Sequence, residues 1–128
     1  MPEITTVVTC PVHGTELHSL PTKYGLRWSC SVPDCNVIWW GNKDTTPADY
    51  ETRQARKGAH ATFDRLWQGP DAVMSRGEAY EWLQRTFELS PENAHIGLFT
   101  KAQCEDLCYA VRRWMGKDRQ DKKGQERL

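Results

Sequence analysis

Two short turns of the sequence carry pairs of metal-binding residues, and they constrain the fold more than any other feature. The first turn, "CPVHG", places Cys10 and His13 in a C-x-x-H spacing, and Gly14 follows. The second, "CSVPDC", begins with Cys30 and ends with Cys35. Zn²⁺ prefers four tetrahedral ligands of nitrogen or sulfur type, and short loops commonly supply them in pairs. The sequence therefore predicts one structural Zn²⁺ held by these two cysteine and histidine pairs.

The use of cysteine in the chain favours metal over disulfide bonds. The chain has five cysteines, an odd number that suits a purely disulfide framework poorly. Its first ten residues, "MPEITTVVTC", lack the basic and apolar regions of a signal peptide. We therefore expect a cytoplasmic protein, because thiols stay reduced there and paired cysteines more often bind metal. His18 is near the first turn but is expected on a strand, so His13 is the better fourth ligand.

The segments around the two turns are expected to form short antiparallel strands. A stretch that contains Leu17 and Leu20 predicts one strand, and Leu26 and Trp28, which alternate with polar residues, predict another. Turn-forming residues at 21–25 separate them. The β-branched and aromatic run "NVIWW" predicts a third strand. The order of turn, hairpin, turn and strand is the layout of a zinc ribbon, which we assign to residues 1–45. Since protein side chains fill all four ligand positions, the metal is expected to be structural.

Residues 46–116 predict three helices, which gives an α+β fold class overall. Each helix begins with a start signal: Pro47 after a candidate N-cap Thr46, the capping box "SRGE", and the capping box "TKAQ". Apolar residues follow at three- and four-residue steps, most clearly in the third helix, where they are Cys104, Leu107, Cys108, Val111, Trp114 and Met115. We expect this unit to pack on the ribbon. Residues 117–128 are charged and lack apolar periodicity, which predicts a loosely ordered tail.

The cysteines and histidines of the helical region allow two interpretations besides simple packing. Cys104 and Cys108, one helical turn apart, could form a second metal site with His60 and His95. They lie on the apolar stripe, however, and free cysteine is among the most buried residue types, so core packing is favoured. His60 and Asp64 could form an acid–base pair in a nuclease. The sequence has no glycine-rich phosphate loop and no paired carboxylates framing a second histidine, so no enzyme activity is expected.

Because the net charge is zero, an electrostatic partner would have to bind to a local charged patch. Lys+Arg and Asp+Glu number 17 each, so no global field draws the protein to a nucleic acid or a membrane. No apolar run approaches the length of a membrane span. Adjacent Trp39 and Trp40 must point to opposite faces of a strand, which leaves one of them available for a partner. The residues predicted to contact a nucleic acid or a protein partner are Lys23, Arg27, Trp28, Trp39, Trp40, Lys43, Arg53, Arg56 and Lys57. Aromatic residues interleaved with cations are typical of single-strand binding, but core tryptophans and solvated cations would give the same pattern.

Parts of the chain resemble known families. "LRWSCSVPDCNVIWWG" resembles the second knuckle of the zinc ribbons at the C-termini of type I topoisomerases, which bind single-stranded DNA. The run from Cys10 to about Cys104 resembles a family of phage and prophage proteins described only as zinc-finger-containing. The shared motifs are "CPVHG", "YGLRWSC", "AHATFDRLW", "SRGEAYEWL" and "HIGLF". Members usually carry cysteine where this chain has His13, which remains a competent ligand. The resemblance implies a phage origin and a zinc site, and no known activity.

These observations predict a small non-enzymatic binding module. The first hypothesis is a protein that binds nucleic acid, either single-stranded or duplex DNA, through the ribbon aromatics and the basic residues. The alternative is a phage effector or adaptor that binds and modulates a host protein in the host cytoplasm, with exposed Trp and Arg side chains as anchors. The third hypothesis is a nuclease. No membrane partner and no small-molecule substrate are expected.

Overall fold

The computed structural model describes the backbone of residues 8–127 and the side chains of residues 8–116. The chain divides into two compact units, Met1–Gln54 and Ala55–Leu128, which are described separately below. A three-stranded antiparallel sheet lies in the first unit and three α-helices follow it, so the predicted α+β class is confirmed.

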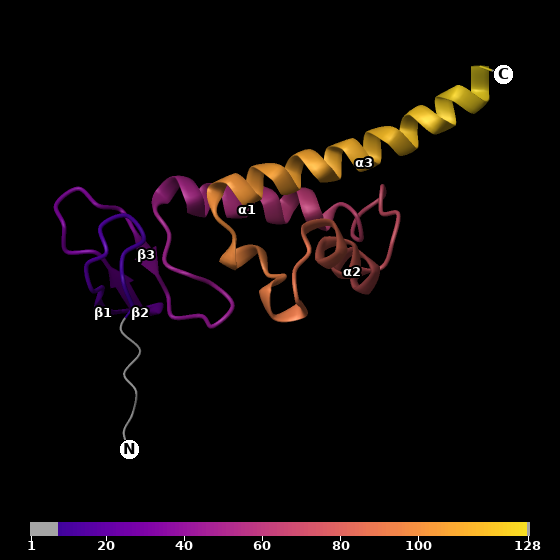
Figure 1. Ribbon diagram of the computed structural model, residues 1–128. Coiled ribbons are helices and arrows are strands. Elements are labelled where there is room, and N and C mark those ends of the chain that lie inside the picture. The colour runs from indigo at the N-terminus through magenta and orange to yellow at the C-terminus, as the bar shows by residue number, and fades with distance from the viewer. Residues whose placement is uncertain (1–7, 128) are drawn as a thin grey trace. The chain divides into compact units, whose positions relative to one another are not determined.

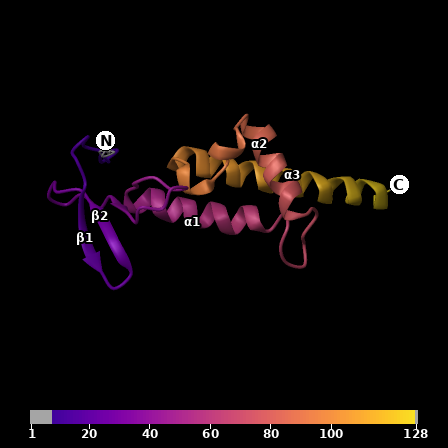
Figure 2. The ribbon, with the colours of Figure 1, turned by 90° about the horizontal axis from the view of Figure 1, so that it is seen from below.

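The sheet has the strand order β1-β2-β3 (Figure 1). Strand β1 spans His18–Thr22, β2 spans Gly25–Ser29 and β3 spans Ile38–Trp39. The first two strands form the hairpin that Figure 2 shows from below. Its turn is narrower than the predicted 21–25, because only Lys23 and Tyr24 lie between the strands. Gly25 makes this tight turn accessible, since its φ of 114° lies in the region that favours glycine.

Strand β1 is an edge strand that contains a proline. Pro21 pairs with Leu26 of β2, although the sequence placed it in the turn. Proline lacks an amide hydrogen and is tolerated where that position of the strand does not have to donate to a neighbour. Because β1 has a partner on one side only in the described sheet, the proline fits there without breaking the ladder.

The core of the first unit is small. Cys10, Leu17 and Val37 are buried, and Trp28 and Trp39 pack against them. The two indole rings lie with centroids 6.0 Å apart at a tilt of 49°. A core of this size buries little apolar surface, so we expect the unit to depend on a metal for its stability.

Helix α1, Tyr50–Asp64, begins three residues after the predicted Pro47. Ala48 exchanges both of its backbone hydrogen bonds with Ile38, over 3.0 and 3.2 Å, so this residue extends the sheet and cannot join the helix. The helix is capped instead by Asp49, whose Oδ1 accepts from the backbone N–H of Thr52 at 2.8 Å. The predicted cap at Thr46 was therefore wrong, because a pairing with a strand determines the start of the helix.

The second unit contains most of α1 together with α2 (Arg76–Phe87) and α3 (Lys101–Arg127). Two short 3₁₀ helices, η1 (Pro91–Asn93) and η2 (Ile96–Leu98), connect α2 to α3. Helices α1 and α3 lie side by side in Figures 1 and 2. The buried residues of the core are Ala59, Phe63, Leu66, Ala79, Leu83, Ala94, Ile96, Phe99, Cys104, Leu107 and Val111. These side chains come from all three helices, from the α1–α2 connection and from the α2–α3 connection.

Both predicted capping boxes are present. The Ser75 hydroxyl accepts from the backbone N–H of Glu78 at 3.1 Å, and the Glu78 carboxylate accepts from the backbone N–H of Ser75 at 2.8 Å. Thr100 and Gln103 make the same pair of bonds at the start of α3. In α2 the backbone N–H of Ser75 holds the pKa of the Glu78 carboxyl below its usual value, because the bond favours the charged form. Local sequence signals therefore set the start of both helices.

Replacing Ser75 by alanine should lower the free energy of unfolding of the second unit by about 1 kcal/mol, because the first turn of α2 loses a side-chain acceptor. Urea denaturation followed by circular dichroism measures the change. The contribution of Glu78 should be present above the unfolded-state pKa of a glutamate and should fade as the pH falls through its lowered folded-state pKa. Ser90→Ala is the matched control, because Ser90 precedes η1 without a side-chain capping bond. An equal loss in both variants would contradict the role of the box.

Helix α3 is longer than the sequence indicated. Its backbone continues to Arg127, through the residues predicted as a loosely ordered tail. The segment contains three Lys, two Arg and two Gln, which have good helix propensity, and it contains no proline. This part of the sequence has no apolar periodicity, so the pattern that predicted the helix ended at Met115. Among the residues that the structure describes, no helix has both the length and the apolar character needed to cross a bilayer.

Candidate metal centre

The two Cys/His turns are tight, hydrogen-bonded knuckles. In the first, the Gly14 N–H donates to the Cys10 carbonyl, and the Cys10 N–H donates to the Thr15 carbonyl, each over 2.8 Å. Gly14 has a φ of 72°, which a residue without a Cβ adopts at little cost. In the second knuckle the Cys35 N–H donates to the Val32 carbonyl at 3.1 Å. These turns place the ligand side chains of each pair on the same side of the loop.

The four predicted ligands converge on one point. The ligand atoms of Cys10, His13, Cys30 and Cys35 all lie within 4.8 Å of one another. His13 Nδ1 lies 3.7 Å from the sulfurs of both Cys10 and Cys30, and the Cys10 and Cys35 sulfurs lie 3.8 Å apart. A tetrahedral site with Zn–S bonds of ~2.3 Å separates its sulfurs by ~3.8 Å. A disulfide requires ~2.05 Å, so these cysteines are free thiols arranged at metal-site spacing.

The surroundings of the sulfurs favour the charged form at Cys30 and the neutral form at Cys35. The hydroxyl of Thr15 lies 3.1 Å from the Cys30 sulfur, and the Val32 N–H donates to that sulfur at 3.4 Å. The Thr15 bond is the main cause that lowers the pKa of Cys30 to about 6. At Cys35, a backbone bond from Val37 lowers the pKa, but burial and the neighbouring sulfurs outweigh it and leave the pKa raised. When one thiol ionises, its negative charge makes ionisation of a neighbouring thiol less favourable. A bound divalent cation offsets this repulsion and stabilises the thiolates.

The sequence did not identify Thr15 as part of this site. It follows Gly14 directly in the chain, and its hydroxyl and carbonyl contact two different ligand residues. A hydroxyl residue at the end of a metal knuckle is the signal that could have indicated it. Asn36 was also missed, although its side-chain oxygen accepts from the backbone N–H of Tyr50 at 3.0 Å. This bond connects the second knuckle to the first residue of α1.

A sheet with a Cys₃His cluster formed by two knuckles defines the chain as a zinc-finger type of protein. The donor set and spacing are compatible with one zinc ion. The model of the DUF3268 family, a zinc-finger-containing domain, matches residues 11–114, and the chain belongs to this family. No match was found among curated proteins or among solved structures.

The three ribbon tryptophans predicted to contact a partner differ in their exposure. Trp28 and Trp39 are half-buried in the core of the first unit, and the Trp39 Nε1 donates to the carbonyl and hydroxyl of Thr45 at 3.2 and 3.0 Å. Trp40 is 48% exposed. The expected division of the adjacent pair is therefore observed, with Trp39 as the packed member and Trp40 as the exposed one.

The predicted cations also differ in their contacts. Arg53 Nη1 donates to the carbonyls of Asn36 and Ala48 at 2.6 and 2.8 Å, within the first unit. Arg56 Nε donates to the carbonyl of Phe99 at 2.8 Å in the second unit. Both guanidinium groups thus hold backbone segments together.

The other four predicted cations have fewer bonds to the fold. Lys43 and Lys57 are exposed. Lys23 lies over the ring of Tyr24, with its Nζ 5.1 Å from the centroid. Arg27 is half-buried, and its Nε is buried without a hydrogen-bond partner among the described residues. Lys57 belongs to the second unit and the other three to the first.

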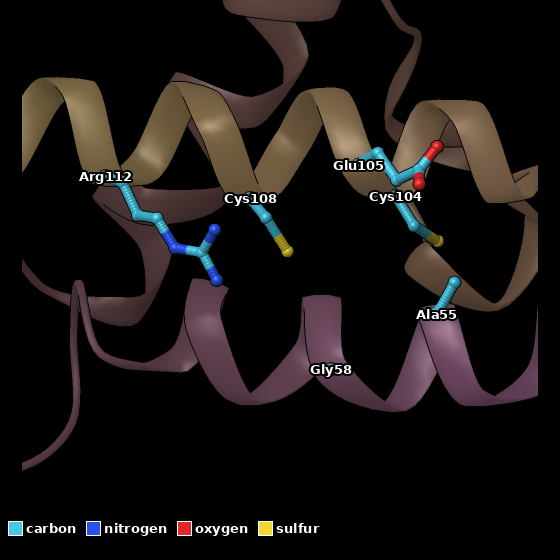
Figure 3. A pocket seen from close by; sticks show the side chains of 6 residues that line it. All are labelled: Ala55, Gly58, Cys104, Glu105, Cys108 and Arg112. Atoms are coloured by element: carbon cyan, nitrogen blue, oxygen red, sulfur yellow. The ribbon is translucent and has the colours of Figure 1, made fainter.

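Cys104 and Cys108 lie in a groove of about 330 Å³ between α1 and α3 (Figure 3). Cys104 is buried in the helical core, and burial raises the pKa of its thiol to about 11, so it stays protonated near neutral pH. Across the described residues, the ligand set of the first unit is the sole group that meets the geometric criteria for a metal site. Core packing of Cys104 is thus confirmed. His60 is exposed on α1 and was not brought into a metal cluster.

Proposed function

We propose that the protein is a non-enzymatic nucleic-acid-binding module, and that the zinc-stabilised sheet provides the contact surface. The observation that carries this proposal is the exposure of Trp40 beside two packed tryptophans. The indole of Trp40, directly after β3, leaves about half of its apolar surface in solvent, because it does not pack in the small core. Base–aromatic stacking uses such a surface, and it is worth about 1–3 kcal/mol per base.

The cations that support this surface belong to the same unit. Arg53 donates to two backbone carbonyls, whereas the side chains of Arg27, Lys23 and Lys43, which lie in or beside the strands, make no such bond within the part of the chain that the structure describes. Phosphate groups attract such side chains, and each contact releases counterions from the nucleic acid. The metal centre serves this function indirectly, because the knuckles fix the strands that carry the surface.

Binding to a DNA oligonucleotide should weaken by roughly 20- to 40-fold between 50 and 200 mM salt if about three phosphates are contacted. Replacing Arg27 by glutamine should reduce the affinity and make this salt dependence shallower, because one phosphate contact is lost. Fluorescence anisotropy with labelled oligonucleotides measures both effects. Arg85→Gln removes an exposed cation from α2 and serves as the matched control. If neither DNA nor RNA binds at low salt, nucleic-acid binding is wrong.

A second candidate is supported by the exposed apolar side chains of the β1–β2 hairpin. Leu20, Tyr24 and Leu26 are 54%, 77% and 48% exposed. Apolar and aromatic side chains of this kind anchor protein–protein contacts. In this case the chain is a phage protein that binds a host protein through the hairpin. Tyr24→Ala should then abolish capture of one defined partner from host lysate, while binding to DNA is absent from the start.

A further inference from the structure

The sheet has two chemically different faces. Neighbouring side chains along a strand alternate between faces, and directly paired residues share a face. Trp28 pairs with Trp39, and both belong to the core of the first unit. This face is therefore the inner one. The residues on either side of Trp28 point to the opposite, outer face, and so does Trp40, which follows Trp39.

One row of residues crosses the outer face at Arg27. Leu20 of β1 pairs with Arg27 of β2. Continuing the β2–β3 register by one residue places Trp40 opposite Arg27 on its other side. The row thus reads Leu20, Arg27, Trp40, and its two apolar members are 54% and 48% exposed. A cation lies between two exposed apolar side chains, one of which is an indole.

The first unit is poor in positive charge for a duplex-binding protein. Between residues 8 and 54 the sequence has four cations, Lys23, Arg27, Lys43 and Arg53, against five acids, Glu16, Asp34, Asp44, Asp49 and Glu51. The guanidinium of Arg53 is already bonded to two backbone carbonyls. Affinity for a duplex depends mainly on phosphate contacts, and three cations among five acids supply few of them.

An unpaired base is a better ligand for this row than a duplex. The faces of paired bases are covered by their neighbours in the stack, whereas the bases of a single strand can turn outward and lie against an aromatic ring. The row lies on the face of a three-stranded sheet. We propose that the row of Leu20, Arg27 and Trp40 is a binding site for single-stranded nucleic acid. A base stacks on Trp40, and Arg27 contacts the adjacent phosphate.

This inference rests on the proposed function and narrows it to one class of ligand and one face of the sheet. In the sequence-based hypothesis all three ribbon tryptophans contact the nucleic acid. In the site proposed here only Trp40 does so, because Trp28 and Trp39 lie in the core of the first unit. We also expect that stacking contributes more than charge. With three cations at most, the logarithm of affinity should fall with the logarithm of salt concentration at a slope no steeper than about −2.

The test compares one labelled oligothymidylate, a duplex of equal length and the matching single-stranded RNA, each titrated with the zinc-loaded full chain. The single strands should bind at least about tenfold more tightly than the duplex, because only they offer unstacked bases. Trp40→Ala should weaken single-strand binding by roughly 5- to 150-fold, and Trp40→Phe should restore much of it, because a ring is regained. Tyr109→Ala removes an exposed aromatic residue from α3 and is the matched control. Zinc content is measured for every variant to show that the first unit is intact.

The outcomes separate this inference from the broader proposal. Equal or tighter binding of the duplex, or an unchanged single-strand affinity in Trp40→Ala with zinc retained, would overturn the stacking site and leave nucleic-acid binding in place. Absence of binding to all three ligands at low salt would overturn both.

Discussion

Replacing Cys30 by serine should remove zinc from the protein and unfold the first unit. The wild-type chain should contain one zinc per molecule, and the variant should contain almost none. Three buried residues, with two half-buried tryptophans against them, form nearly all of the apolar core there. In small zinc modules the metal contributes about 10–16 kcal/mol near neutral pH, which exceeds what so small a core can replace. Elemental analysis and the dispersion of the tryptophan indole NMR signals measure the loss.

The effect should be confined to the first unit. Helices α2 and α3 have their own core, which contains none of the ligand residues, so most of the helical circular dichroism should remain. His13→Cys is the matched control, because it exchanges one competent zinc ligand for another and should keep the metal. His13→Ala should lose affinity for zinc. A zinc-free Cys30→Ser chain with unchanged indole signals would show that the sheet does not depend on a metal.

Replacing Phe63 by alanine should destabilise the second unit by about 3–5 kcal/mol, because truncation leaves a cavity that the surrounding helices fill only partly. Phe63 is fully buried, and its ring meets that of Tyr80 edge to face at a centroid distance of 5.1 Å. This contact joins α1 to α2 within the second unit. Small domains are stable by only about 5–15 kcal/mol, so the variant should unfold at a clearly lower urea concentration.

Two further variants serve as controls for the predicted loss of stability in Phe63→Ala. Phe63→Leu refills much of the volume and should lose less stability than alanine. Tyr109→Ala changes an aromatic residue that is 63% exposed and should shift the free energy of unfolding by no more than about 0.5 kcal/mol. The zinc content should stay at one per molecule in all three variants. A loss in Tyr109→Ala as large as that in Phe63→Ala would show that the packing of Phe63 is not the cause.

The metal centre could be predicted from the sequence because the two ligands of each pair lie only a few residues apart. Each knuckle holds two ligands within a few residues, and a hairpin is the shortest chain that brings two knuckles together. The capping boxes at Ser75 and Thr100 were predictable for the same reason, since each box lies within four consecutive residues. These features can be recognised without knowing which residues far along the sequence lie near them in the fold.

The features that were missed depend on partners far along the sequence. The start of α1 depends on the pairing of Ala48 with Ile38, which no local signal shows. The bond from Arg56 Nε to the carbonyl of Phe99 likewise joins two segments that are far apart in the sequence. The alternation of Trp39 and Trp40 showed that one ring must be exposed, but only the register with Trp28 decides which one.

Pro21 has a consequence for self-association. An edge strand offers unpaired amide and carbonyl groups to which an extended segment of another molecule can add, and this is a common route to aggregation. At Pro21 the outer edge of the sheet has no amide hydrogen to offer, so an added strand would lose one hydrogen bond near the end of β1. A proline at this position limits growth of the sheet from one molecule to the next, while its exposed apolar side chains remain accessible to other ligands.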